Sequence, residues 1–269
     1  IASPDISIIT NANNAHLGEF GSEENLVKAK GEILESLTKD GVALINIASP
    51  HKETWHEMSG TQSLTFFGKG SGIYPSEITE SKSHINFNLN YSTSSLNVNL
   101  SMIGLHQVDN ALAAAACAIA LGIEPDVIKK GLENTLPEKG RLELIELENF
   151  KILDDSYNAN PESMKAAIDC IGNFSGEKVL VLGSMGELGI DSKKLHQEIG
   201  DYVRQSNINH LLTIGEDAKE YQGKQFEDIS SIYDAIQNNH QGSTILIKGS
   251  RMMRLNELVD NLVNSENSS

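Results

Sequence analysis

The sequence predicts an α/β protein in two parts, and three observations carry this prediction. Short β-branched or apolar runs alternate with segments whose apolar residues recur every three to four positions, the pattern of strands alternating with amphipathic helices. Several runs are apolar throughout, which is typical of parallel strands covered on both faces. A polar stretch with Pro and Gly, residues 136–140, separates mixed patterns from a regular strand–helix alternation. We therefore expect one domain in residues 1–136 and a second, doubly wound domain in residues 137–269.

The first part opens with the pattern of a parallel β-α-β unit. Residues 6–10 form a short β-branched run. Apolar residues at helical spacing follow Gly21 and predict a helix that Gly41 ends. Residues 42–47 are then nearly all apolar, as in a strand buried on both faces. This order predicts two parallel strands joined by a helix.

The middle of the chain changes to alternating patterns. Three short runs alternate apolar and polar side chains, which predicts antiparallel strands with one face in water. These runs are residues 64–67, 85–89 and 96–100. An Ala-rich helix is expected over residues 107–121, and another over residues 124–133, where Pro125 suits a first helical turn.

The second part repeats short apolar runs and helical segments. Parallel strands are expected at residues 152–153, 179–182, 211–214 and 245–247. Helices are expected at residues 161–171, 192–205, 231–238 and 255–262. Parallel strands joined by helices form a sheet with helices on both faces.

The composition excludes several classes of function. The 269 residues include 37 Asp and Glu against 21 Lys and Arg, a net charge of -16 that repels polyphosphates and anionic membranes. The longest apolar stretch, residues 111–123, is too short to span a bilayer, and no signal peptide opens the chain. We therefore expect a cytoplasmic protein that neither binds nucleic acid nor inserts into a membrane. Cys117 and Cys170 stand alone in helical segments, which favours buried thiols over a disulfide or a metal site.

The first candidate site follows the first strand. Residues 10–17 lie at the expected carboxyl edge of a sheet, where α/β proteins bind their ligands. His16 there could bind a metal or polarise a phosphate, or it could be a structural hydrogen-bonding group. Lys30 lies in the helix that follows, where a solvated surface lysine is the ordinary alternative. The residue types alone leave these alternatives open.

A second polar segment lies between a strand of the second part and the helix that follows it. Its side chains include those of Asp155, Tyr157, Asn158 and Asn160. Such groups can hold a ribose, a metal-bound phosphate or an amino-acid group, because the strand fixes them while the loop exposes them. The alternative is that Asp and Asn make the turn and cap the helix.

Charged and hydroxyl side chains occur at three further places. Arg141, just after the linker, can form bidentate hydrogen bonds to a phosphate or pair with a surface acid. Lys248, Ser250 and Arg251 follow the last strand, where they can receive a carboxylate or form an ordinary helix-start turn. Residues 182–189 are Gly-rich, but the glycines do not follow GxGxxG and an acidic residue lies among them, which disfavours a phosphate cradle.

Six segments, in family order, resemble the Mur ligase family, and within it the branch that adds D-alanyl-D-alanine to a peptide. They are ITNANNAHLGEFGSEENLVKAKGEI (9–33), HQVDNALAAAACAIALGI (106–123), KGRLE (139–143), DDSYNANPESMKAAI (154–168), LGSMGELG (182–189) and IKGSRMMRL (247–255). Together they extend over nearly the whole chain. The DSYNANP and MGELG stretches are the ones specific to that branch.

The resemblance implies an ATP- and Mg²⁺-dependent ligase of peptidoglycan synthesis. It implies that ATP converts the terminal carboxylate of UDP-N-acetylmuramoyl-tripeptide into an acyl phosphate, which the amine of D-alanyl-D-alanine attacks. It also implies that the chain holds the second half of a central ATPase domain, a mixed sheet with helices, and a Rossmann-like C-terminal domain. The chain begins at Ile1 without Met and contains no GxxxxGKS/T phosphate-binding loop, so we expect a fragment with weak or no ligase activity alone.

The resemblance also assigns roles to individual residues. His16 matches the family's magnesium ligand, and Lys30 matches the lysine that is carbamylated in related ligases to help hold that metal. Asn110 matches the contact to adenine, and Arg141 and Asp155 match residues that reach the ATP phosphates and ribose. His16, Lys30 and Arg141 are thus the expected catalytic residues. The peptide and dipeptide would be received by Tyr157, Asn158, Asn160, Lys248, Ser250 and Arg251.

Three places depart from the family pattern. Residues 48–51 are Ala-Ser-Pro-His where an Asp-Asp-Pro turn is usual, Gln107 stands where Asn is usual, and Ser184 replaces a common Asp. Two alternatives remain open. One is a folylpolyglutamate-synthase-like ligase, which the DSYNANP and MGELG segments disfavour. The other is a non-catalytic homologue without the phosphate-binding loop, which binds a nucleotide or peptide.

Overall fold

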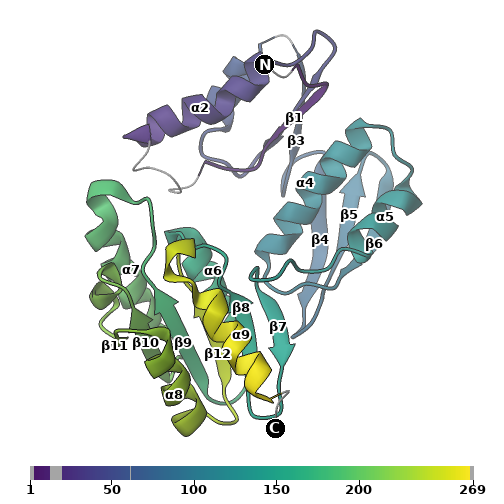
Figure 1. The fold of residues 1–269 in the computed structure, drawn as a ribbon. Coiled ribbons are helices and arrows are strands. Elements are labelled where there is room, and N and C mark those ends of the chain that lie inside the picture. Colours follow the sequence, from purple (N-terminus) through teal and green to yellow (C-terminus); the bar gives the residue numbers. More distant parts are fainter. Residues whose placement is uncertain (1–2, 13–19, 61, 267–269) are drawn as a thin grey trace. The chain divides into compact units, whose positions relative to one another are not determined.

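The computed structural model describes residues 3–12, 20–60 and 62–266 (Figure 1). They form two compact units, which part between Leu136 and Pro137. Each unit contains a β-sheet covered by helices, so the predicted α/β class is confirmed.

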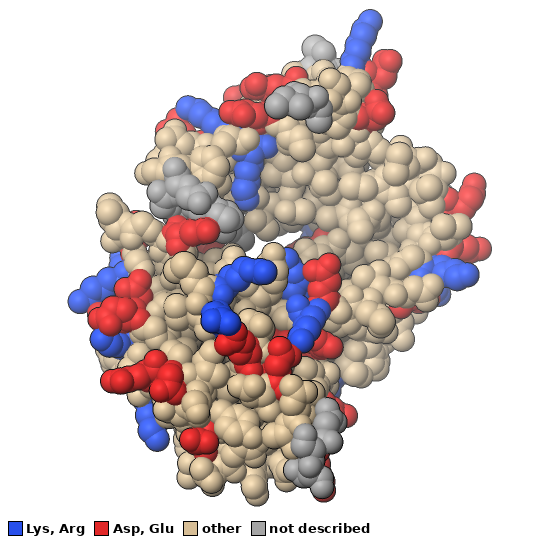
Figure 2. All heavy atoms as spheres, in the orientation of Figure 1, with Lys and Arg blue, Asp and Glu red and all other residues tan. Residues whose placement is uncertain are grey.

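The face drawn in Figure 2 is mixed in charge, with acidic and basic side chains interspersed among uncharged ones. None of the helices formed by the described residues combines the length and the apolar content needed to cross a membrane. Cys170 is buried and Cys117 half-buried, and neither forms a disulfide within the described residues.

The first unit contains a mixed sheet in the order β1-β2-β3-β4-β5-β6. Its strands are β1 (Ile6–Ile9), β2 (Val42–Asn46), β3 (Ser63–Phe67), β4 (Ile73–Glu80), β5 (Ile85–Tyr91) and β6 (Ser94–Leu100). Its helices are α2 (Glu23–Glu35), α3 (Lys52–Met58), α4 (His106–Ala120) and α5 (Pro125–Glu133). Strands β1, β2 and β3 are parallel, whereas β4, β5 and β6 form an antiparallel meander.

Two expectations for this unit were wrong in detail. The run at residues 64–67 was expected to be antiparallel, but β3 runs parallel to β2, with Leu44 opposite Thr65. Helix α2 ends at Glu35 rather than at Gly41. The Gly41 N–H donates to the Thr38 carbonyl, so this glycine belongs to the turn that leads into β2.

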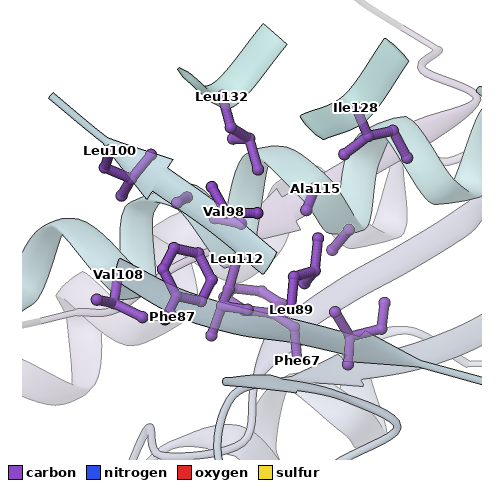
Figure 3. Close-up of a cluster of buried hydrophobic side chains, with 14 of the residues drawn as sticks. Phe67, Phe87, Leu89, Val98, Leu100, Val108, Leu112, Ala115, Ile128 and Leu132 are labelled. Atoms are coloured by element: carbon purple, nitrogen blue, oxygen red, sulfur yellow. The ribbon is translucent and has the colours of Figure 1, made fainter. Parts of the chain in front are cut away.

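The core of the first unit lies between α4 and the antiparallel strands (Figure 3). Phe87 and Leu89 of β5 and Val98 of β6 are fully buried against α4. These strand residues pack against the face of α4 that carries Leu112 and Ala115. The small alanines of α4 let the helix approach the sheet closely, which explains why an Ala-rich segment is buried here.

The second unit contains a sheet in the order β11-β10-β9-β12-β8-β7. Its strands are β7 (Glu143–Glu146), β8 (Lys151–Asp155), β9 (Lys178–Gly183), β10 (His210–Ile214), β11 (Lys224–Phe226) and β12 (Thr244–Lys248). Its helices are α6 (Pro161–Gly172), α7 (Ser192–Gln205), α8 (Ile229–Asn239) and α9 (Leu255–Glu266). All neighbouring strands are parallel except β7, which pairs antiparallel with β8 at the edge.

Both faces of this sheet are buried, which confirms the doubly wound fold. Ile152, Val181 and Ile245 face one side, where they form a core with α8 and α9 (Figure 1). Leu153 and Leu246 face the other side and are also fully buried. Helix α6 contacts β12 there, and α7 contacts α6. Because neither face of the sheet is exposed to water, the central strands are apolar throughout.

Candidate active site

The centre of the candidate site is an ion pair between a buried lysine and a half-buried aspartate at the carboxyl edge of the second sheet. Asp155 ends β8 and Lys248 ends β12, and the two residues lie opposite each other in the parallel ladder. Lys248 Nζ lies 2.7 Å from Asp155 Oδ2, and it also donates to the Asn158 carbonyl oxygen at 2.8 Å. The lysine side chain is only 2% exposed. The pair thus ties two strand ends to the loop that follows β8.

Burial and charge act in opposite directions on Asp155. Burial raises the pKa of its carboxyl, and the charge and hydrogen bond of Lys248 oppose that shift. The ammonium of Lys248 therefore favours the ionised form of a carboxyl that burial disfavours.

Close backbone packing joins the linker to this loop. The Tyr157 N–H donates to the Gly140 carbonyl at 3.0 Å. Gly140 has a φ of +78°, and a Cβ there would lie 3.2 Å from the Tyr157 nitrogen. Glycine is the residue that suits this conformation and this close approach. The contact brings Arg141, the next residue, to the Tyr157 ring.

The Tyr157 ring carries two guanidinium groups. Arg141 Cζ lies 4.2 Å and Arg251 Cζ 5.3 Å from the ring centroid, both over the ring. Arg141 Nε also lies 3.1 Å from a carboxylate oxygen of Glu138. Stacking on an aromatic ring orients a guanidinium while leaving N–H donors at its rim for other partners.

Two cavities adjoin Tyr157 and Arg251, which line both of them. The larger cavity, about 510 Å³, is lined among others by Lys139, Ser156, Tyr157, Arg251, Arg254 and Glu257. The smaller cavity, about 210 Å³, is lined among others by Tyr157, Asn158, Asn160, Glu187, Ser250 and Arg251. The lining of the larger cavity carries three cations and one carboxylate, and two of these cations also pair with acids, Lys139 with Asp260 and Arg254 with Glu257. The remaining surplus of positive charge on the lining suits an anion. The smaller cavity instead offers one cation and one carboxylate, together with amide and hydroxyl groups.

Three buried oxygens at this edge lack a hydrogen-bond partner within the described part of the chain. They are Asp154 Oδ2, Ser156 Oγ and Ser250 Oγ. Ser156 lines the larger cavity and Ser250 the smaller one. A buried polar atom without a partner costs about 1–3 kcal/mol. Each hydroxyl can therefore gain from a polar ligand in the cavity that it lines.

A buried histidine holds the Gly-rich loop of residues 182–189. The Met185 N–H donates to His196 Nε2 at 2.9 Å, and His196 Nδ1–H donates to the Ser192 carbonyl at 2.7 Å. Burial lowers the pKa of His196, although Asp217 and Glu220 oppose the shift. The imidazole is thus neutral, with its proton on Nδ1, and fixes the loop through one acceptor.

The sequence interpretation had missed His196. The available signal was its place on α7, since it shares the buried face with Ile199 and Val203 at helical spacing. The glycines of the loop also have a packing role. A Cβ on Gly183 would lie 2.8 Å from Met253 Cγ, so this residue must be small.

The protonation of His196 predicts a pH dependence of stability. Its folded pKa lies below the unfolded value of about 6.5, so the stabilisation is complete above that pH and is lost as the pH falls below it. We expect His196→Gln, which keeps an acceptor for the Met185 N–H, to flatten this loss. Urea unfolding between pH 8 and pH 5 measures it. His56→Gln, at an exposed histidine, should keep the wild-type slope, and equal slopes for wild type and His196→Gln would contradict the prediction.

The first unit carries the other predicted site residues. Lys30 Nζ donates to the Asn11 carbonyl at 3.1 Å, just beyond β1, and burial lowers the pKa of this lysine. Asn110 lies exposed on α4, where its amide donates to Gln107 Oε1. His16 lies outside the described residues.

The structure brings all eight predicted site residues of the second unit together at one edge. These are Arg141, Asp155, Tyr157, Asn158, Asn160, Lys248, Ser250 and Arg251. Two of these residues also have the structural roles that the sequence left open. Asn160 Oδ1 accepts from the Ser163 N–H and caps α6, and Arg141 pairs with Glu138. Lys139, Glu187 and Arg254 line the cavities and were not predicted as site residues.

Comparisons with known proteins show the family of the chain. The family described as "Mur ligase middle domain" matches residues 1–118, and the one described as "Mur ligase, glutamate ligase domain" matches residues 140–251. Two curated relatives are named UDP-N-acetylmuramoyl-tripeptide--D-alanyl-D-alanine ligase. The one from Buchnera aphidicola (subsp. Baizongia pistaciae) is 36% identical over 98% of this chain, and the one from Escherichia coli is 34% identical over 96%. The chain spans 60% of the length of each.

Solved structures give the same result. MurF from Acinetobacter baumannii superposes with a TM-score of 0.91 at 32% identity, over 97% of this chain and 60% of that one. MurF from Thermotoga maritima, solved in complex with ADP, superposes with a TM-score of 0.85 at 25% identity, over 96% of this chain and 61% of that one. A folylpolyglutamate synthase from Mycobacterium tuberculosis shares the fold, at 18% identity, 91% coverage of this chain and 61% of that chain, with a TM-score of 0.72. The chain belongs to the Mur ligase family.

Proposed function

We propose that the protein containing this chain is a cytoplasmic, ATP-dependent ligase that joins UDP-N-acetylmuramoyl-tripeptide to D-alanyl-D-alanine. Residues 1–136 would form part of its ATP-binding domain and residues 137–269 its C-terminal ligase domain. The curated relatives that bear this name support the proposal. The structural observation that carries it is the pair of cavities that adjoin Tyr157 and Arg251, one suited to an anion and one to a ligand with both charges.

The larger cavity suits the phosphates of a nucleotide. Lys139, Arg251 and Arg254 place three positive charges on its lining. Arg141, oriented by Tyr157, lies beside them with a guanidinium that matches phosphate oxygens. ATP would supply the phosphoryl group that activates the tripeptide carboxylate as an acyl phosphate. Arg141 and Asp155 would orient its phosphates and ribose, and Asn110 of the first unit would contact adenine.

The smaller cavity suits D-alanyl-D-alanine. This dipeptide is a small zwitterion, with a carboxylate, an ammonium and one amide. Arg251 can bind its carboxylate, Glu187 can hold its amine, and Ser250 can hydrogen-bond its amide. Lys248 is buried against Asp155 and Asn158, so we assign it to positioning this loop rather than to touching the dipeptide. Tyr157, Asn158 and Asn160 complete the lining on the side of the peptide.

Lys30 fits a magnesium ion only in a modified form. As an ammonium it donates to a carbonyl and would repel a cation. Its lowered pKa increases the fraction of free amine, which is the form that carbon dioxide modifies. A carbamate would turn this side chain into an anionic oxygen ligand of the kind Mg²⁺ prefers. We propose that carbamylated Lys30, with His16, holds the Mg²⁺ that offsets phosphoryl charge.

A chimera tests the proposed activity. The chain would replace the matching 60% of the E. coli relative, and phosphate release would be measured with ATP, UDP-N-acetylmuramoyl-tripeptide and D-alanyl-D-alanine. We expect release that requires both substrates. A parallel arm would contain a folate acceptor and L-glutamate instead, and release in that arm alone would overturn the proposal in favour of the folate-type alternative.

The isolated chain provides the second measurement. We expect little or no turnover from it, but D-alanyl-D-alanine should raise its unfolding temperature, because a ligand that binds the folded state stabilises that state. L-alanyl-L-alanine is the matched control and should shift it less. No difference between the two dipeptides, together with an inactive chimera, would contradict the assignment.

A further inference from the structure

Two histidines and a glutamate meet at the amino end of the second sheet, at the edge opposite the candidate active site. Glu177 immediately precedes β9, and His210 is the first residue of β10. His240 caps the end of α8 as the residue directly after it, shortly before β12 begins. Residues up to 63 positions apart in the chain are thus brought to one place by the sheet.

Their side-chain atoms converge on one point. Glu177 Oε1 lies 3.1 Å from His240 Nδ1 and 3.3 Å from His210 Nε2. All three atoms lie within 4.8 Å of one another, and the two imidazole rings have centroids 4.7 Å apart. Ligands held tetrahedrally at 2.0–2.1 Å from a metal lie about 3.3 Å from each other. Two of the three separations already match that value.

The backbone holds these three residues in place. The Glu177 carbonyl accepts from the Thr244 N–H at 2.9 Å. His210 pairs with Val179 in the ladder between β9 and β10. The His240 N–H donates to the Ile236 carbonyl at 3.0 Å. The cluster is therefore anchored by sheet and helix hydrogen bonds, as a preorganised ligand set requires.

Burial leaves one side of the cluster open. The His240 side chain is only 8% exposed, whereas those of Glu177 and His210 are 41% and 47% exposed. An ion among the three atoms would keep at least one coordination position toward solvent. This is the arrangement of a three-ligand site completed by water.

We propose that Glu177, His210 and His240 form a binding site for one divalent transition-metal ion, with Zn²⁺ as the best match. Two imidazole nitrogens and one carboxylate oxygen are the donor set that Zn²⁺ accepts, whereas Mg²⁺ prefers oxygen ligands and octahedral geometry. The site lies at the far edge of the sheet from Asp155 and Lys248, so it is separate from the proposed nucleotide and peptide cavities. By coordinating all three side chains, the bound ion cross-links the starts of β9 and β10 to the end of α8 and stabilises the second unit.

Calorimetric titration tests the proposal on the untagged 269-residue chain, freed of metal by a chelator. We expect Zn²⁺ to bind Glu177, His210 and His240 with one equivalent, and a large excess of Mg²⁺ to leave it in place. Zn²⁺ should also raise the unfolding temperature by mass action. Co²⁺ is a second probe, because a four-coordinate Co²⁺ complex with nitrogen ligands absorbs visible light far more strongly, and at longer wavelength, than the hydrated ion.

Substitutions at the two exposed ligands assign the site. Loss of an outer-shell partner alone weakens metal binding about 10–100-fold, so His210→Gln and Glu177→Gln should each weaken Zn²⁺ binding at least about 100-fold. Both positions are exposed enough that the metal-free variants should fold, and circular dichroism checks this. His56→Gln is the matched control, since His56 is an exposed histidine beside Glu53 in the first unit. Zn²⁺ binding that persists in both ligand variants, or no Zn²⁺ binding by the wild type, would overturn the proposal and leave only the hydrogen bond between Glu177 and His240 and the contact of Glu177 with His210.

Discussion

Replacing Lys248 by methionine is expected to lower the free energy of unfolding of the second unit by about 3–5 kcal/mol. The lysine is 2% exposed, and its ammonium is the counter-charge of the Asp155 carboxylate. Methionine fills much of the same volume but leaves that carboxylate buried and without a counter-charge. The Asn158 carbonyl would lose its donor as well. Urea unfolding at neutral pH, followed by far-ultraviolet circular dichroism, measures the loss.

The pH dependence separates this electrostatic effect from simple misfit. Removal of Lys248 leaves only burial and the neighbouring charges to act on Asp155, so the pKa of its carboxyl rises further. A folded-state pKa above the unfolded value means that stability is lost as the pH rises through the folded pKa. The deficit of Lys248→Met relative to wild type should therefore shrink at acidic pH. A deficit that is constant with pH would point to packing rather than to the unpaired charge.

Two further variants complete the comparison. Lys248→Met combined with Asp155→Asn removes both charges, and it should regain much of the stability that the single variant loses. Lys151→Met is the matched surface control, since Lys151 pairs with Glu146 at the other end of β8 with both side chains exposed. An exposed pair contributes about 0–1 kcal/mol, so this variant should differ little from wild type. A control as unstable as Lys248→Met would contradict the assignment.

The sequence predicted the second sheet better than the first because its pattern is periodic. Every strand that is buried on both faces was visible as an apolar run, as Val179, Leu180 and Val181 of β9 illustrate. The edge strands β7 and β11 were missed, because an edge strand is short and partly wet and its residues alternate weakly.

In the first unit, the local sequence pattern did not predict whether a strand pairs parallel or antiparallel with its neighbour. The alternation of apolar and polar residues in β3 is typical of an antiparallel strand, yet β3 pairs parallel with β2. Strand β4 was not expected, since Pro75 and the positive φ of Glu77 disrupt its pattern where the register shifts. Helix α3 is seven residues long and buries a single side chain, Trp55, so its periodicity is too short to detect.

The sequence predicted which loops form the candidate site, but it did not predict which side chains contact each other there. That Asp155 and Lys248 end strands follows from the apolar runs before them. That they pair requires β12 to lie between β8 and β9, a strand order that no local pattern carries. The cluster of Glu177, His210 and His240 left no signal at all, because its members are at least 30 residues apart in the chain.

Arg141→Ala is expected to lower kcat of the chimeric ligase about 10²–10³-fold, the usual cost of removing a donor that stabilises charge in the transition state. Stacking on Tyr157 and the contact with Glu138 orient its guanidinium before any ligand arrives. Arg141→Lys should recover only part of the rate, because an ammonium lacks the planar fork that matches phosphate oxygens. Phosphate release at saturating substrates measures kcat for each variant.

The split between kcat and KM decides what Arg141 does. If it acts on the transferring phosphoryl group, Arg141→Ala should leave KM for D-alanyl-D-alanine nearly unchanged, because that ligand is assigned to the smaller cavity. Tyr157→Leu keeps the charge but removes the stacking surface, so its kcat should fall less than that of Arg141→Ala. Arg204→Ala, at an arginine of α7 that lines neither cavity, should leave both parameters within about twofold of wild type. An Arg141→Ala chimera with wild-type kcat would reduce this residue to a surface partner of Glu138, and the phosphate site would then rest on Lys139, Arg251 and Arg254 alone.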